Sequence, residues 1–162
     1  RTCRENLSAA VRDAGVDPGR LLFAPKAGQE QHLGRLTAAD LAFDTFPCNG
    51  HTTTSDALWA GVPVVTLAGR HFASRVSESL LRAVEMPELV AADLAAYGEL
   101  AIALAADGER LAACRAKLAE KRTTAPLFDT PRFARNLEAL YRQAWQRHVA
   151  GQSPTPLIVP AP

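Results

Sequence analysis

Hydrophobic positions follow two different patterns along the chain. Up to residue 67, short apolar runs stand between amphipathic segments, whereas from residue 74 onward apolar positions recur mainly every three or four residues. Short apolar runs bounded by turn residues predict buried strands, and spacings of three and four predict helices. We therefore expect strands at residues 20–24, 41–46 and 63–67, and a short last strand at 89–91.

Helices are expected in the segments between and after these strands. The first residues read like the interior of an amphipathic helix that stops at Gly15, and the helix from Thr52 should be capped by its threonines and end at Gly61. The expected helical segments are 1–14, 29–36, 52–60, 74–84, 93–106, 109–122 and 131–149. The last of these carries Phe133, Tyr141 and Trp145 on a single stripe, which must pack on something large.

The order of these elements predicts the fold class. Continuous apolar strands that alternate with helices indicate βαβ units and a parallel sheet, so we expect a Rossmann-like α/β domain with additional C-terminal helices. This domain should span residues 1–150. Residues 151–162 hold four of the eleven prolines and form a Pro-rich tail that we predict to be disordered.

Composition and charge narrow the function classes. The length of 162 residues suits one domain, and 18 basic against 17 acidic residues give a net charge of +1 without a basic field for nucleic acid or a membrane surface. Three separate cysteines favour a reducing, cytoplasmic setting over a disulfide framework or a zinc site. The histidines lack ligand spacing, so we expect no metal.

The loop after the second expected strand has the content of an anion site. Asn49 and Gly50 permit an unusual backbone path, and His51, Thr52 and Thr53 bring an imidazole, hydroxyls and free N–H groups to the start of a helix. These features suit a diphosphate at the carboxyl edge of a parallel sheet.

Asp56 lies three residues after Thr53, where its carboxylate can accept hydrogen bonds from a ribose diol. A capping-box variant explains the same spacing without any ligand. His32, Lys26 and Arg35 form a basic and aromatic group after the first expected strand, which can equally be solvated surface.

The amino-acid sequence around this loop resembles that of a known family. The segment FPCNGHTTTSDALWAGVP at residues 46–63 is similar to the C-terminal catalytic lobe of the O-linked N-acetylglucosamine transferase family, including its bacterial and Spindly-like relatives. Further matching segments are residues 23–26, 30–35, 41–45, 64–66, 73–77, 123–130 and 141–145. The resemblance implies the C-terminal lobe of a GT-B glycosyltransferase, usually downstream of tetratricopeptide repeats.

The resemblance also implies roles for residues on the N-terminal side of the loop. Ala27, through its backbone, and Arg35 should lie by the uracil, and His32 against the base. Gln29 stands where animal members place a lysine against the base, and Lys26 one turn away can partly compensate. Uridine and guanosine donors therefore both stay open.

The resemblance also implies roles for residues of the loop itself, and for catalytic residues that residues 1–162 do not contain. His51, Thr52 and Thr53 should meet the diphosphate and Asp56 the ribose, in agreement with the reading of the residues alone. The catalytic lysine and histidine of the family have no counterpart in residues 1–162. Catalytic residues are therefore unassigned.

The leading hypothesis is the donor-binding lobe of an inverting enzyme that transfers N-acetylglucosamine from UDP-GlcNAc to Ser or Thr of a protein acceptor. The resemblance implies no metal or other cofactor, and it implies an N-terminal catalytic lobe and repeats as partners. Alternatives are fucosyl transfer from a GDP sugar, a nucleotide-binding module without turnover when isolated, and a degenerate Rossmann domain that binds nothing.

Overall fold

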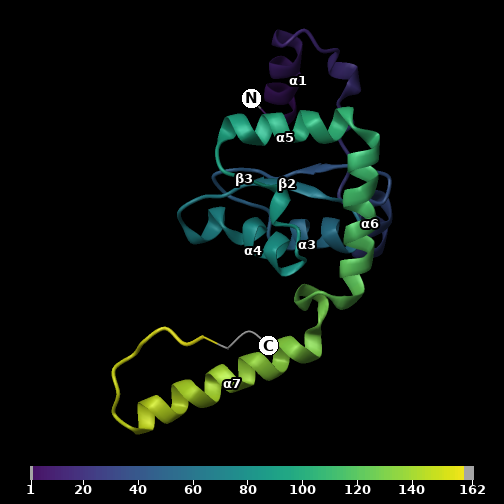
Figure 1. Ribbon diagram of the computed structural model, residues 1–162. Helices are drawn as coiled ribbons and strands as arrows, with labels where there is room; N and C mark the ends of the chain where they lie inside the picture. The colour runs from purple at the N-terminus through teal and green to yellow at the C-terminus, as the bar shows by residue number, and fades with distance from the viewer. Residues whose placement is uncertain (1, 159–162) are drawn as a thin grey trace. The chain divides into compact units, whose positions relative to one another are not determined.

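The computed structural model describes residues 2–158 (Figure 1). It divides into two compact units, Arg1–His32 and Leu33–Pro162. The two units are described separately below. Within residues 2–158, none of the helices combines the length and the apolar character that crossing a membrane requires.

The first unit is built around helix α1 (Cys3–Asp13). Thr2 caps this helix through a capping box, in which its hydroxyl accepts from Glu5 N–H and the Glu5 carboxylate accepts from Thr2 N–H. The expectation that these residues lie in the interior of a helix is therefore wrong. Gly15, at φ 77°, follows the helix end in the left-handed region, as its predicted stop required.

The strand expected at residues 20–24 is also wrong. The short helix η1 (Pro18–Arg20) is followed by extended chain without ladder pairing, and the Leu22 side chain is 91% exposed. A parallel strand is stable when a neighbour takes its hydrogen bonds and both of its faces are covered. The apolar composition of residues 20–24 predicted burial, but no strand in residues 2–158 pairs with this segment.

The second unit contains a parallel sheet of three short strands, β1 (Ala42–Phe43), β2 (Val64–Leu67) and β3 (Val90–Ala91). Their order is β1-β2-β3, with β2 in the centre. Ala42 pairs with Val64, and Thr66 pairs with Val90. These three strands and the α/β fold class were predicted and are confirmed.

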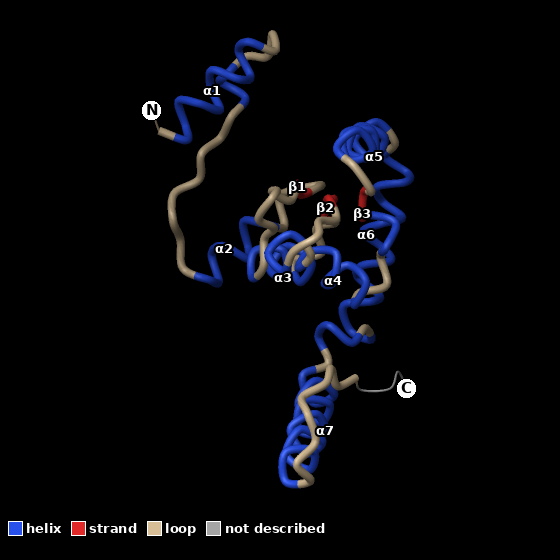
Figure 2. Tube along the Cα trace, turned by 90° about the vertical axis from the view of Figure 1, so that its left-hand side faces the viewer, coloured by secondary structure: helices blue, strands red, loops and turns tan. Residues whose placement is uncertain are grey.

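Helices cover both faces of this sheet (Figures 1 and 2). Helix α5 (Leu94–Ala106) packs on one face against β2 and β3, and α3 (Thr52–Trp59) and α4 (Val76–Ala83) pack on the other. Fully buried side chains between these layers include Leu58, Val65, Leu81, Met86, Leu89 and Leu104. Each large apolar side chain contributes about 1.5–3 kcal/mol when it is buried.

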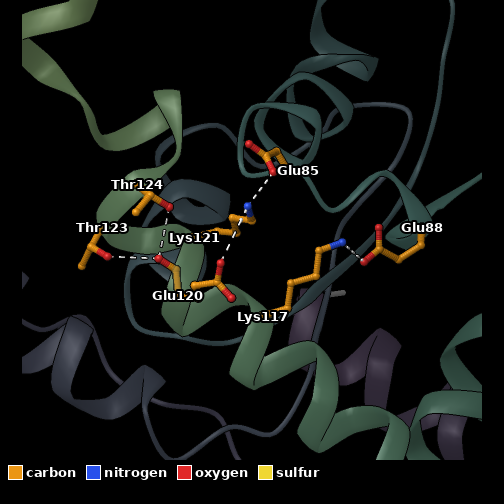
Figure 3. Close-up of polar contacts among 7 residues, drawn as sticks. All are labelled: Glu85, Glu88, Lys117, Glu120, Lys121, Thr123 and Thr124. Carbon is orange, nitrogen blue, oxygen red and sulfur yellow. Dashed lines mark hydrogen bonds and ion pairs between the residues drawn. The ribbon is translucent and has the colours of Figure 1, made fainter.

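Helix α6 (Gly108–Thr124) runs along the side of these layers (Figure 1). Two of its lysines form ion pairs with the segment that follows α4. Lys121 Nζ lies 2.7 Å from Glu85, and Lys117 Nζ lies 2.6 Å from Glu88 of helix η3 (Pro87–Leu89) (Figure 3). The buried Leu118 lies between these two lysines in the sequence. The ion pairs therefore flank a hydrophobic anchor.

The last helix, α7 (Thr130–Val149), follows the 3-10 helix η4 (Pro126–Phe128). It has no buried residue, and Phe133, Tyr141 and Trp145 are about two-thirds exposed, at 64%, 66% and 66%. The apolar stripe predicted from the sequence is thus open in this chain.

The tail after α7 begins with Gly151 in the left-handed region, at φ 66°. The Ser153 carbonyl accepts a hydrogen bond of 3.0 Å from the Arg147 guanidinium, and residues 152–158 contain no helix or strand. Residues 159–162 of the predicted tail lie outside the described residues. Disorder of the tail, and the domain limits at 150, stay predictions.

The remaining expected helices are present at the predicted places. Helix α2 (Gln29–Leu36), α3, α4, α5, α6 and α7 confirm the three-to-four spacing. Asp93, Asp107 and Asp129 cap α5, α6 and α7 through carboxylate oxygens that accept backbone N–H groups.

Candidate functional site

Two loops meet at the carboxyl edge of the sheet. Residues 44–51 connect β1 to α3, and residues 68–75 follow β2. Asn49 N–H donates a hydrogen bond of 2.8 Å to the Ala73 carbonyl, and the His51 and Phe72 rings meet edge to face with centroids 5.8 Å apart. The parallel order of β1 and β2 brings these loops together, and ligands bind at this edge in open α/β sheets.

Asp44, at the end of β1, organises the first loop from inside. Its side chain is 7% exposed, and its carboxylate accepts hydrogen bonds from Gly50 N–H at 2.7 Å, Thr45 N–H at 2.9 Å and the Thr66 hydroxyl at 2.5 Å. Three donors compensate the carboxylate for its lost hydration. The Asp44 carboxylate therefore joins the end of β1, the centre of β2 and the turn before α3.

Gly50 is held on its carbonyl side as well. The Gly50 carbonyl accepts hydrogen bonds of 3.0 Å from the Thr54 hydroxyl and 3.0 Å from the Ser77 hydroxyl. A Cβ at residue 50 would lie 2.5 Å from Thr54 Oγ1 and 2.7 Å from Thr53 Oγ1. This turn therefore requires glycine for steric reasons.

The start of α3 presents open backbone donors. His51 is the N-cap and makes no side-chain capping bond, and Ser55 N–H donates to the His51 carbonyl at 3.1 Å. Within residues 2–158, the N–H groups of Thr52, Thr53 and Thr54 have no protein acceptor. Such a helix start favours an anion.

Two readings of the threonines are corrected by this geometry. They do not cap α3, because all three lie inside the helix and the Thr54 hydroxyl donates to the Gly50 carbonyl instead. The capping-box alternative for Thr53 and Asp56 fails for the same reason, since a capping box needs Thr53 at the N-cap. The prediction that the Asp56 carboxylate binds a ribose diol stays untested by this geometry.

The structure places the candidate residues in three groups. His51, Thr52 and Thr53 are exposed at the start of α3, and Asp56 is half-buried one turn further on. Asn49 is buried, and its amide donates to the Thr45 carbonyl at 3.0 Å, while its Oδ1 has no partner within the described residues.

The third group lies on and before α2. Arg35 belongs to the same unit as the loop, and its neighbour Leu36 lines a cavity that Gly50 and Thr53 also line. Ala27, Gln29 and His32 belong to the unit Arg1–His32. These base-binding candidates stay predictions.

That cavity has a volume of about 200 Å³. Pockets that enclose a whole ligand of drug size measure about 300–1,000 Å³, so this cavity is too small to enclose a whole nucleotide sugar. A larger cavity of about 520 Å³ runs along α4, between Phe72 and Arg82, and contains none of the candidate residues. The start of α3 is therefore the place within the described residues where the candidate diphosphate residues and open backbone N–H groups coincide.

No group of three metal-ligating side chains occurs in residues 2–158. Independence of a metal stays a prediction from the resemblance.

Sequence reasoning missed the residues that hold the loop in place. Asp44 is the one acidic residue in the apolar run 41–46, a signal that a buried, bonded carboxylate belongs there. Tyr97 of α5 donates a hydrogen bond of 2.9 Å to the Asp44 carbonyl. Burial, and then the nearby Asp44 charge, raise the pKa of Tyr97 above its usual value, so the phenol stays protonated as a donor.

Comparison with known proteins decides the family. Residues 2–137 match the family described as Glycosyl transferase family 41. The chain belongs to this family. Among its relatives is the UDP-N-acetylglucosamine--peptide N-acetylglucosaminyltransferase of Caenorhabditis elegans, which is 42% identical over 147 residues, covering 91% of this chain and 13% of the relative.

Plant members of family 41 are similar over the same region. The SEC protein of Arabidopsis thaliana is 41% identical over 86% of the chain, and the SPINDLY protein of Solanum lycopersicum is 36% identical over 94%. Both are named as probable enzymes of the same kind. The chain spans 13–16% of the length of these three relatives.

A solved structure of family 41 shares the fold. A mutant of the O-GlcNAc transferase of Thermobaculum terrenum superposes with a TM-score of 0.81 at 34% sequence identity. The match covers 88% of this chain and 28% of that chain. The expected fold, a Rossmann-like lobe of a GT-B glycosyltransferase with additional helices, is confirmed.

Proposed function

We propose that this chain is the donor-binding lobe of an inverting protein O-glycosyltransferase that transfers N-acetylglucosamine from UDP-GlcNAc to Ser or Thr of a protein acceptor. The observation that carries the proposal is the open start of α3, where three backbone N–H groups stand beside the hydroxyls of Thr52 and Thr53. Two relatives that share this region, those of C. elegans and T. terrenum, are named as transferases of this kind.

The reaction explains why such a helix start is useful. The acceptor hydroxyl oxygen attacks C1 of the sugar, the bond from C1 to the diphosphate oxygen breaks, and UDP departs with the electron pair. The proton of the acceptor hydroxyl must pass to a base or to water. Negative charge therefore develops on the β-phosphate, and oriented N–H groups stabilise it without reorganising.

Each candidate residue has a task in this proposal. Thr52 and Thr53 bind the diphosphate through N–H and hydroxyl groups, assisted by the His51 imidazole, while Asp56 accepts hydrogen bonds from the ribose diol. The base-binding side comprises Ala27, Gln29, His32 and Arg35. Gly50 and Asn49 shape the turn between β1 and α3.

Several partners follow from the resemblance. The catalytic lysine and histidine should come from segments outside residues 1–162, and tetratricopeptide repeats should accompany them. Residues 1–162 alone then bind nucleotide without sustained turnover. A cytoplasmic setting and independence of a metal belong to the same proposal.

A nucleotide competition test decides the donor. In the intact protein that carries residues 1–162, UDP should displace a labelled UDP-GlcNAc donor at lower concentration than GDP does. Stronger displacement by GDP would favour the fucosyl alternative. A transfer assay on residues 1–162 with an acceptor peptide tests the role of the lobe, since sustained transfer would contradict it.

A further inference from the structure

The turn before α3 is held by hydrogen bonds on both the N–H and the carbonyl side of Gly50. Asp44 holds the N–H of Gly50, and the buried hydroxyls of Thr54 and Ser77 hold its carbonyl. Thr54 is 4% exposed and Ser77 is fully buried, and their two oxygens are 2.9 Å apart. Every polar backbone group of Gly50 is therefore bonded inside the protein.

This arrangement determines where the next N–H group points. The Gly50–His51 peptide bond is trans, so its N–H points opposite to its carbonyl. Because the Gly50 carbonyl is directed at the buried Thr54 and Ser77 hydroxyls, the His51 N–H is directed away from them. It adds a further donor next to the open N–H groups of Thr52 and Thr53.

We propose that Asp44 is a positioning residue for diphosphate binding: its carboxylate accepts the Gly50 N–H and holds this turn so that the N–H groups of His51, Thr52 and Thr53 converge on one anion. This inference rests on the proposed function, because it assigns the anion to a nucleoside diphosphate. The Thr66 hydroxyl and Thr45 N–H fix the Asp44 carboxylate in turn.

Asp44 acts by fixing the position of the turn and not by attracting the diphosphate electrostatically. A negative carboxylate repels an anion by Coulomb's law, so its charge cannot contribute to the affinity for a diphosphate. Its value lies in accepting three hydrogen bonds at fixed positions. An asparagine at residue 44 keeps Oδ1 as an acceptor for Gly50, and its amide can donate to Thr66.

This distinction gives the test. In the intact protein that carries residues 1–162, Asp44→Ala should weaken UDP binding by about tenfold or more, the loss expected when charge-assisted bonds to a phosphate lose alignment. Asp44→Asn should bind UDP within twofold of the wild type or tighter. The KM for the donor should rise in Asp44→Ala, while the KM for the acceptor peptide stays within twofold.

A matched control separates positioning from general loss of stability. Leu118 of α6 is fully buried, and its apolar side chain takes no part in the hydrogen bonds that hold Gly50, so Leu118→Ala lowers the free energy of unfolding and should leave UDP affinity within twofold. If Asp44→Ala does not fold, Thr66→Val removes one support of the carboxylate and should weaken UDP binding, and Thr66→Ser should restore it.

The outcomes distinguish the two proposals. UDP affinity within twofold of the wild type in both Asp44→Ala and Thr66→Val would overturn the role of Asp44 and leave the proposed function standing. Equal losses in Asp44→Ala and Leu118→Ala would reduce Asp44 to a stabilising residue and also overturn it. A wild-type protein that binds no nucleoside diphosphate would overturn both.

Discussion

Gly50 lies so close to Thr54 that a Cβ at residue 50 would be 2.5 Å from Thr54 Oγ1. Gly50→Ala should therefore displace the start of α3 and weaken UDP binding, by about tenfold or more if one charge-assisted hydrogen bond is lost. Gly98→Ala in α5 is the matched control, because a Cβ there meets nothing within 4 Å. It should raise the free energy of unfolding by about 0.5–1 kcal/mol and leave binding unchanged. Calorimetric titration with UDP and thermal unfolding of both variants check these expectations.

The diphosphate contacts of α3 are tested by the double change of Thr52 and Thr53 to Val. Loss of two hydroxyl donors should weaken UDP binding by about 1–3 kcal/mol, and far-UV circular dichroism should stay the same. The control is the same double change at Thr123 and Thr124 of α6, whose hydroxyls donate to the Glu120 carbonyl (Figure 3). Equal UDP affinities in the wild type and the α3 variant would move the phosphate site elsewhere.

Asp56 is expected to bind the ribose, and its variant should show this as a change in affinity without a change in stability. Asp56→Asn should weaken UDP binding several-fold, because a neutral amide is a poorer acceptor for the diol. Asp107→Ala removes a true helix cap, whose carboxylate accepts from Arg110 N–H at 2.9 Å. That control should cost about 0.5–2 kcal/mol in stability without affecting binding. A lower melting temperature for Asp56→Asn with unchanged affinity would exclude the ribose role.

The ion pair of Glu85 and Lys121 predicts how stability depends on pH. The hydrogen bond and charge of Lys121 lower the pKa of Glu85, and Glu85 raises the pKa of Lys121. The stabilisation from Glu85 is present above its ordinary pKa and is lost as pH falls through the lowered value. The contribution of Lys121 is present below its ordinary pKa and is lost as pH rises through the raised value.

Lys121→Met tests this dependence by urea unfolding across pH. The difference in stability from the wild type should be constant between roughly pH 5 and pH 10 and should shrink on either side of this window. Lys26 occurs in none of the ion pairs found among the described residues and supplies the control Lys26→Met. A difference between wild type and Lys121→Met that does not vary from pH 3 to pH 11 would contradict the assignment.

The open stripe of α7 should cause self-association of residues 1–162. Phe133, Tyr141 and Trp145 are about two-thirds exposed, and large aromatic side chains favour burial by about 1.5–3 kcal/mol each. Trp145→Ala should reduce association in sedimentation experiments and impair the intact protein, where we expect this helix to pack on the other lobe. A monomer at high concentration with the fluorescence of a buried indole would show that the stripe is satisfied within this chain.

The sequence by itself determined those features that depend on local spacing. The strands at Ala42–Phe43 and Val64–Leu67 and the helices α3 to α7 follow from apolar runs, three-to-four periodicity and turn residues, all of which act within a few residues. The grouping of residues His51 to Asp56 could also be predicted from the sequence, because these residues are close neighbours in the chain at the start of one helix. The resemblance to a known family then predicts a chemical role for each of them.

Only the tertiary structure decided which residues hold that cluster in place. Asp44 reaches Gly50 across six positions and Thr66 across twenty-two, while Ser77 reaches Gly50 across twenty-seven, and no periodicity encodes such pairs. The failed strand at residues 20–24 has the same cause, because a strand depends on a hydrogen-bonded neighbour as well as on its own apolar side chains. Local patterns record what each segment tends to do, and long-range hydrogen bonds and burial decide whether that tendency is realised.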